Sequence, residues 1–230
     1  MRPSSFCRKK LEPGTVATPI WAATLAFKCF RYTHSQHHRF TNHQDGRDPD
    51  VWTLNGPFWQ LPFRWATVDV SHTVYYLRHL KQRPWREWRG QLLQVGVLTS
   101  AIIAAVWSGH VTDLLLLWLL PARITFFLIG FLFDYLPHHG AHATPSESRY
   151  RTATVRLGRE RIVSPAMLYQ NYHLVHHMHP LVPFYRYLRV WSRNDEHYVE
   201  NDAAMISLCG RPITADEYRT LRSIAHHDHP

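Results

Sequence analysis

The sequence lacks the features of several common protein classes. Its three cysteines, Cys7, Cys29 and Cys209, are far apart and form no Cys-x-x-Cys pair. They therefore indicate free thiols in a reducing compartment and no disulfide framework. The N-terminus has no apolar segment with a small-residue cleavage site, so no secretory signal is predicted. No zinc-finger pattern or aromatic RNA-binding strand accompanies the net charge of +9, and nucleic acid is not expected as a partner.

Charge is almost absent from two long apolar runs in the middle of the chain. Residues 92–109 contain no charged side chain, and residues 114–133 are interrupted only by Pro121 and Arg123. Each run is long enough to cross a bilayer, whereas the helices of a soluble hairpin, which is the alternative, normally keep a polar face. The two runs, joined by a short polar link at 109–113, therefore predict a transmembrane helical hairpin.

Basic residues flank this hairpin on both outer sides and are absent from its link. By the positive-inside rule, both ends of the hairpin are expected on the cytoplasmic side of the membrane. The basic residues before the first run are Arg78, Lys81, Arg83, Arg86 and Arg89, and those after the second run are Arg149, Arg151 and Arg156.

The remaining segments complete an all-α prediction. A helix is expected to start at Thr18-Pro19 and to continue to His38, because a hydroxyl followed by proline favours a helix start. The aromatic-rich residues 51–90 are expected to lie in the headgroup zone as interfacial helices, with core helices of a soluble protein as the alternative. The predicted fold is an integral membrane protein with one transmembrane hairpin, interfacial helices and a cytosolic histidine-rich cap. Its predicted divisions are an N-terminal arm at 1–17, a main domain at 18–190 and a cytosolic tail at 191–230.

Histidine is the residue that this sequence has in excess, with 18 in the chain. The stretches 34–38 and 173–177 share the spacing His-x-x-His-His, which places three imidazoles within roughly a 100° arc of one helix face. The second stretch is expected on a helix that starts at Ser164-Pro165 and ends before Pro180. A third group, His138, His139 and His142, lies between them, whereas isolated histidines such as His72 are expected to be structural. Because clustered polar rings beside apolar sequence are costly and imidazole binds transition metals, the three groups predict a metal centre.

The number of clustered histidines exceeds what one zinc ion needs, which indicates two metal ions. The chain has no Glu-x-x-His pair of the ferritin-like di-iron proteins, and haem held by two histidines would use single histidines on facing spans. A histidine-rich di-iron centre at the membrane surface therefore fits best. Such a centre can activate dioxygen and remove hydrogen from an unactivated C–H bond, and its position beside the bilayer favours an apolar substrate.

The same motifs resemble those of the membrane fatty acid desaturases. Residues 31–42 are similar to the second histidine box of that family, and residues 171–187 resemble its last box. The sequence Asp48-Pro49-Asp50 recurs in related bacterial members. Residues 134–138 are similar to an additional histidine segment of a subgroup that includes carotenoid hydroxylases. The resemblance covers roughly residues 18–190.

This resemblance implies a membrane-bound oxidoreductase that uses a non-haem di-iron centre and dioxygen to abstract hydrogen from a lipid acyl chain. Electrons would come from a ferredoxin or a cytochrome b5-type protein. Asn171 would contact the iron through water, and Asp134 could orient the ligand rings. The implied iron ligands are His34, His37, His38, His173, His176 and His177, with His138 and His142 as further candidates and His139 as an alternative within the same segment.

One motif of the family is missing from the sequence. The first histidine box should precede the second at the end of a transmembrane hairpin, but residues 1–33 contain no histidine. Either the chain is a fragment, or it is a relative that lacks part of the iron shell and has lost one iron site. The missing box favours a truncated, inactive relative that only binds metal or lipid as one alternative. Another is a hydroxylase of a carotenoid or an alkyl chain, because desaturation and hydroxylation share the first hydrogen abstraction. A soluble histidine-rich zinc hydrolase is a further alternative.

Overall fold

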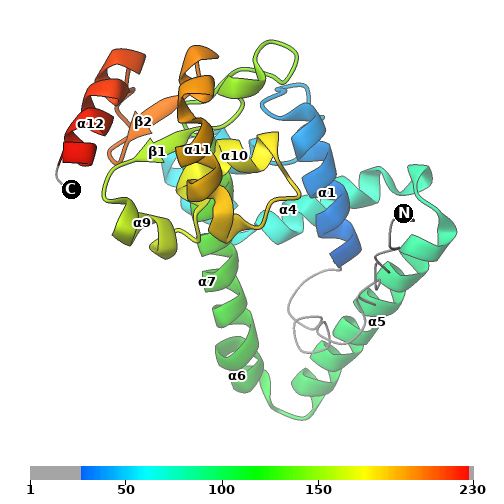
Figure 1. Ribbon diagram of the computed structural model, residues 1–230. Helices are drawn as coiled ribbons and strands as arrows, with labels where there is room; N and C mark the ends of the chain where they lie inside the picture. The colour runs from blue at the N-terminus through cyan, green and yellow to red at the C-terminus, as the bar shows by residue number, and fades with distance from the viewer. Residues whose placement is uncertain (1–26, 228–230) are drawn as a thin grey trace, which may run out of the picture.

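The computed structural model describes residues 27–227, and this part of the chain is mostly helical (Figure 1). The predicted arm at 1–17 and the predicted helix start at Thr18 lie outside the described residues. The helices are α1 (Phe27–Phe40), α2 (Val51–Leu54), α3 (Leu61–Ala66), α4 (Val68–Arg78), α5 (Trp85–Trp107), α6 (Val111–Asp113), α7 (Leu120–Ile129), α8 (Leu136–His138), α9 (Glu160–Ala166), α10 (His173–Met178), α11 (Tyr187–Glu200) and α12 (Ala215–His227). The strands are β1 (Val155–Leu157) and β2 (Met205–Ser207).

Two helical spans are long and apolar enough to cross a membrane, and they agree with the two predicted runs. The first is Trp88–Trp107 within α5, and the second is Val111–His138, which joins α6, α7 and α8 through π-helical turns at Leu114–Leu119 and Gly130–Tyr135. The two spans meet at the turn at 108–110 and diverge from it in a V (Figure 1). The apolar window of the first span is unburied, whereas the second span packs against α3.

The second span is held against α3 and α4 by a close backbone contact and an ion pair. A Cβ atom added at Gly130 would lie 2.8 Å from the Cα atom of Trp65, so only glycine fits there without a shift. Arg123, the charged residue that interrupts the second run, donates to both carboxylate oxygens of Asp69 on α4 at 3.0 and 2.6 Å. The charge within the apolar run is therefore paired, as intramembrane charges generally are.

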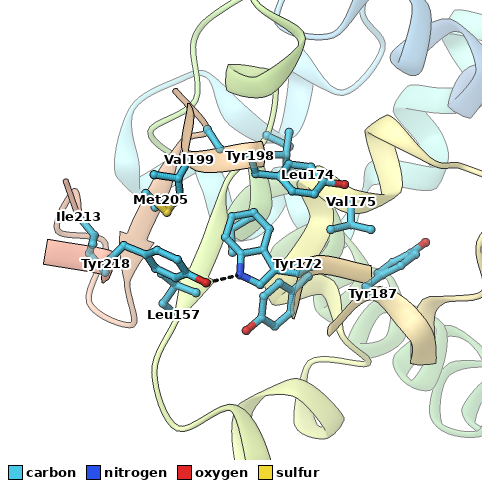
Figure 2. Close-up of a cluster of buried hydrophobic side chains, with 14 residues drawn as sticks. Leu157, Tyr172, Leu174, Val175, Tyr187, Tyr198, Val199, Met205, Ile213 and Tyr218 are labelled. Carbon is cyan, nitrogen blue, oxygen red and sulfur yellow. Dashed lines mark hydrogen bonds between the residues drawn. The ribbon is translucent and has the colours of Figure 1, made fainter. Parts of the chain in front are cut away.

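The largest core lies in the second half of the described chain (Figure 2). Here β1 pairs in parallel with β2, with Val155 opposite Met205 and Leu157 opposite Ser207. This small sheet corrects the all-α prediction, because strands of three residues are too short to show an alternating pattern. Trp191 and Tyr218 are buried in the same core, so residues after 190, expected as a tail, pack tightly against the helices that carry the histidines.

Candidate metal centre

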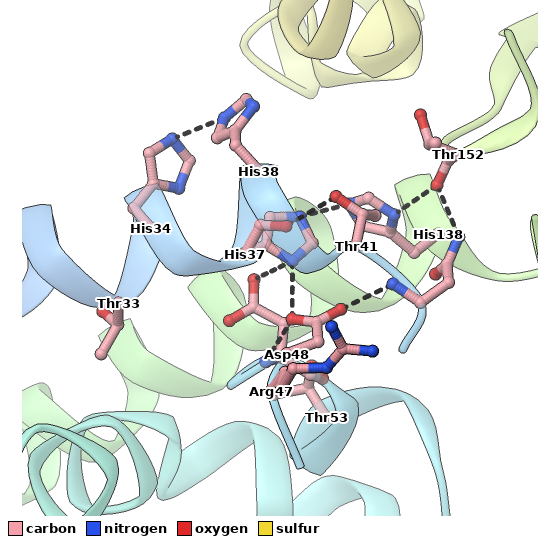
Figure 3. Close-up of polar contacts among 12 residues, drawn as sticks. Thr33, His34, His37, His38, Thr41, Arg47, Asp48, Thr53, His138 and Thr152 are labelled. Atoms are coloured by element: carbon pink, nitrogen blue, oxygen red, sulfur yellow. Dashed lines mark hydrogen bonds and ion pairs between the residues drawn. The ribbon is translucent and has the colours of Figure 1, made fainter. Parts of the chain in front are cut away.

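Seven of the eight predicted ligands converge from α1, α8 and α10 into two adjacent groups. Within each group, the ligand atoms lie within 4.8 Å of one another. The side chains of the four-histidine group are mostly buried, and those of the three-histidine group are half-buried. Figure 3 shows His37 of α1 facing His138, and His34 beside His38. The four-histidine group is His37, His138, His173 and His177, and the three-histidine group is His34, His38 and His176.

The Nε2 atoms in each group point at one another. In the three-histidine group, His38 Nε2 lies 3.1 Å from His34 Nε2 and 2.9 Å from His176 Nε2, and the third side of this triangle is 3.1 Å. Nitrogens bound to one ion at about 2.1 Å lie roughly 3.0–3.4 Å apart. Hydrogen bonds do not explain such a triangle, because a neutral imidazole has one N–H, which points at a single acceptor. The lone pairs converge as they would around a cation.

The four-histidine group has the same spacing. His37 Nε2 lies 3.2 Å from His138 Nε2 and 3.3 Å from His177 Nε2. The His173 ring is 5.0 Å from that of His138 and 4.8 Å from that of His177, measured between centroids. The two groups adjoin each other, since the ring centroids of His38 and His177 are 4.4 Å apart.

Partners on the opposite ring nitrogen orient three of the ligands. His138 Nδ1 lies 3.1 Å from the carbonyl oxygen of Thr152, and His173 Nδ1 lies 2.6 Å from Oε1 of Gln170. His176 Nδ1 lies 2.8 Å from the hydroxyl of Tyr187. Oxygen acceptors at these positions hold the proton on Nδ1 and leave the Nε2 lone pair free to bind a cation.

His37 differs from the other ligands because carboxylates face its Nδ1. Asp48 Oδ1 lies at 2.9 Å and Asp50 Oδ2 at 3.2 Å (Figure 3). Burial alone would lower the pKa of His37, but the negative charges of Asp50 and Asp48 outweigh it and raise this pKa to about 9. These buried carboxylates place negative charge behind the four-histidine group, where it offsets the charge of a bound cation.

The other ligand imidazoles outside the spans are neutral at pH 7. Burial, reinforced by the neighbouring histidines, lowers the pKa of His38 to about 2 and that of His176 to about 4. The same causes hold the pKa values of His173 and His177 well below the ordinary value. Neutral imidazole is the form that binds metal, so these rings need lose no proton before binding.

Two predicted site residues lie away from the converging nitrogens. His142 is exposed and belongs to neither group; with His139 it lines a pocket of about 390 Å³ beside His138. Its role as a ligand stays a prediction. Asn171 is buried and donates through Nδ2 to the Arg156 carbonyl and to Ser164 Oγ. These bonds hold the segment before α10 in place, and the water-mediated metal contact stays a prediction.

Sequence reasoning missed the role of His72. Its Nε2 lies 2.9 Å from Asp50 Oδ1, so this histidine of α4 holds the carboxylate that faces His37. The nearby Asp48-Pro49-Asp50 motif is the signal that could have pointed to a partner of this kind. Asp134 lies near the same carboxylates, and its Oδ2 is buried without a hydrogen-bond partner, so it orients no ligand ring through that atom.

The helix that carries His173, His176 and His177 is shorter than predicted. In place of one helix from Ser164 to Pro180, α9 ends at Ala166, and α10 begins at His173. Leu168 and Tyr169 adopt left-handed backbone conformations, with φ of 48° and 61°, and the Tyr169 N–H donates to the Ser164 carbonyl. Two consecutive left-handed residues other than glycine carry no clear sequence signal.

Comparison with known proteins gives one match. The sequence model of the family described as fatty acid desaturase matches residues 10–208, which includes α1, both spans and α10. Neither a curated protein nor a solved structure shows a significant match to the chain.

Proposed function

Because the chain belongs to the fatty acid desaturase family, we propose that it is a membrane oxidoreductase that abstracts hydrogen from a lipid acyl chain. It would use dioxygen and two iron ions held by the seven converging histidines. The observation that carries the proposal is the convergence of these imidazoles into two adjacent groups, in which the Nε2–Nε2 distances described above are those of nitrogens that share one bound ion. Iron in such sites supplies dioxygen activation.

The residues of this chain would divide the work between the two groups. The four-histidine group is buried, is backed by Asp48 and Asp50, and offers enough ligands to enclose one ion. The three-histidine group is half-buried and offers one ligand fewer. An ion to which the described residues offer three ligands would leave room for a small molecule, so we expect dioxygen to enter on this side.

The substrate and the electron donor would approach from opposite directions. His138 ends the second span, so an acyl chain lying in the bilayer could reach the centre along that span. Phe30 stacks on His34 with ring centroids 5.3 Å apart and lends the three-histidine group an apolar edge. The basic residues that flank the spans support a cytoplasmic location of the cap, where a ferredoxin or a cytochrome b5-type protein would deliver electrons.

Lipid analysis of an expressing host tests this function. We expect new double bonds in acyl chains with the intact protein and none with the His176→Ala variant. The His110→Ala variant, altered in the link between the spans, should match the intact protein. New hydroxyl groups in place of double bonds would favour the alternative of a carotenoid or alkyl-chain hydroxylase. If the protein purified from the host holds two irons per chain but the lipids of the host are unchanged, both desaturation and hydroxylation would be contradicted.

A second candidate is an inactive relative that only binds metal or lipid. Its support is the absent first histidine box, which leaves the second group with three histidines among the described residues. Metal analysis of the purified protein separates the two: two irons per chain would refute the inactive alternative, whereas zinc or less than one iron would favour it.

A further inference from the structure

A series of aromatic side chains leads from the metal centre into the main core. Tyr187 is the first member: its hydroxyl lies 2.8 Å from Nδ1 of the ligand His176. Trp191 lies one helical turn further along α11 and is buried with Tyr187 in the main core. Its ring lies 5.9 Å from that of Tyr218, and its indole N–H donates to the Tyr218 hydroxyl at 3.0 Å. Tyr187, Trp191 and Tyr218 are only 4, 2 and 8% exposed.

A second aromatic residue also connects the metal centre to Trp191. Tyr172 directly precedes the ligand His173 in the chain, and its ring lies 6.0 Å from the Trp191 ring. Two segments that carry or contact metal ligands thus converge on one indole.

The series ends at a phenol that faces a base. The Tyr218 hydroxyl donates to Asp195 Oδ2 at 2.7 Å, and the same oxygen pairs with Arg222 at 2.6 Å. Burial and the Asp195 charge raise the pKa of Tyr218, so its hydroxyl keeps its proton at neutral pH. The Asp195 side chain is 5% exposed, and that of Arg222 is 38% exposed, which brings this end close to solvent. Packing alone does not require a buried carboxylate here, because apolar residues would fill the space without its desolvation cost.

We propose that Tyr187, Trp191 and Tyr218 form an electron-transfer chain that moves an oxidising equivalent from the metal centre to Tyr218. The inference rests on the proposed function, because the oxidant is a metal centre that dioxygen has oxidised. Phenol and indole are among the side chains most easily oxidised by one electron. Electron tunnelling slows steeply with distance, so a step between Tyr187 and Trp191, one turn apart on α11, and a step between the contacting rings of Trp191 and Tyr218 are faster than one long step. The chain protects the ligand histidines when dioxygen reacts without a lipid substrate.

Each transfer balances in electrons and protons. Trp191 would give up one electron to the oxidised metal centre by way of Tyr187, and Trp191 would recover one electron from Tyr218. The O–H bond of Tyr218 breaks as this electron leaves, and its proton moves to Asp195 Oδ2, which leaves a neutral tyrosyl radical. A soluble one-electron reductant of the ascorbate type restores Tyr218, and the proton returns from Asp195.

The first test needs no metal ion bound to the histidines. In a full-length Cys7→Ser, Cys209→Ser background, the Leu221→Cys variant carries a ruthenium photosensitiser on an exposed position one helical turn from Tyr218. Flash oxidation of the ruthenium should produce a tyrosyl radical, detected by its absorbance and its electron paramagnetic resonance (EPR) spectrum. This signal should be lost in the Tyr218→Phe variant and should form more slowly in Asp195→Asn. A solvent deuterium isotope effect on the rate reports the same proton transfer without a second substitution.

The matched control is Tyr75→Phe, which removes a hydroxyl that donates to the Arg47 carbonyl at 2.8 Å, away from this cluster. It should leave the tyrosyl signal unchanged. A full tyrosyl signal in Tyr218→Phe, or a rate without an isotope effect, would overturn the role of Tyr218.

The second test uses iron-loaded protein exposed to dioxygen without lipid. We expect a tyrosyl radical by freeze-quench EPR, and its loss in Trp191→Phe at equal iron content and equal oxygen consumption. Oxygen consumption without a radical in the intact protein would overturn the chain. Absence of oxygen consumption, with a positive flash experiment, would instead refute the proposed function while supporting the oxidation of Tyr218 coupled to proton transfer to Asp195.

Discussion

His37 connects the metal centre to the buried acidic residues behind it. Its Nε2 faces His138 and His177, and its Nδ1 faces two carboxylates. Carboxylates in this position hold the ligand's tautomer and make the imidazole a stronger donor to a metal. The phenol of Tyr187 occupies the corresponding position at His176. The two groups are therefore chemically unequal, and the four-histidine group should bind an ion more tightly than the three-histidine group.

The Asp50→Asn substitution tests the effect of the carboxylates. It removes the negative charge facing His37 and should weaken metal binding by about 10–100-fold. Anaerobic titration with iron or cobalt measures this change in affinity. The visible absorption spectrum of cobalt reports its binding. The control is Asp45→Asn, because Asp45 is exposed and pairs only with Arg47 among the contacts described. Equal affinities in the two variants would contradict the role given to Asp50.

Removing one ligand from the three-histidine group tests the inequality of the sites. The His34→Ala variant should keep one tightly held ion per chain, because the four-histidine group is complete without it. Elemental analysis after dialysis against a mild chelator gives the stoichiometry. The His142→Ala variant should hold as many ions as the intact protein. Loss of metal from His142→Ala would identify His142 as a ligand, and loss of all metal from His34→Ala would show that the two sites depend on each other.

At the scale of the elements, the position of the second span relative to the cap depends on the contact of Gly130 with α3. No side chain separates the two helix backbones at this point, and two turns earlier Arg123 pairs with Asp69 of α4. Because His138 ends this span, any shift of the span at Gly130 moves a ligand of the four-histidine group.

The Gly130→Ala variant should therefore be destabilised by about 1–3 kcal/mol, because the added methyl meets the backbone of Trp65. Thermal unfolding in detergent measures the effect. The matched control is Gly96→Ala in α5, where an added Cβ meets nothing within 4 Å. There, alanine should be neutral or stabilising by about 0.5–1 kcal/mol, since glycine weakens a helix interior. Equal stability of the two variants would show that α3 and the span adjust freely.

The elements also show what the sequence could and could not predict. The two long apolar runs predicted both spans, and the His-x-x-His-His spacing predicted which α1 and α10 side chains share a face. The break at Leu168 and Tyr169 was not predictable, because these residues carry no preference for left-handed backbone. The pairing of His72 with Asp50 joins α4 to the loop after α1, and sequence spacing says nothing about such tertiary contacts. The sequence predicts Trp191 and Tyr218 in a tail, because the charged residues around them mask two amphipathic helices.

At the scale of the whole molecule, the cap, which is the part of the described chain outside the two spans, lies at the open end of the V that the spans form (Figure 1). The metal centre lies at this end, beside the last residue of the second span. The turn at 108–110 lies at the opposite end. If both spans cross the bilayer, this arrangement places the turn and the metal centre on opposite sides of it.

Labelling with a membrane-impermeant maleimide tests this arrangement. In the Cys7→Ser, Cys209→Ser background, the His110→Cys variant should react from outside intact spheroplasts. The Ser146→Cys variant, altered at an exposed position of the cap, should react only after lysis. The reverse pattern would invert the proposed orientation, and labelling of both variants from outside would refute the two-span topology.

The pairing of β1 with β2 can form only late in the synthesis of the chain. These strands close a loop that contains α10, and β2 ends only at Ser207. During synthesis from the N-terminus, both spans have been made before the ribosome releases residue 207. The three histidines of α10 thus reach their final positions late, after both spans have been synthesised. Under the proposed function, iron would therefore be loaded only after this part of the chain has been made.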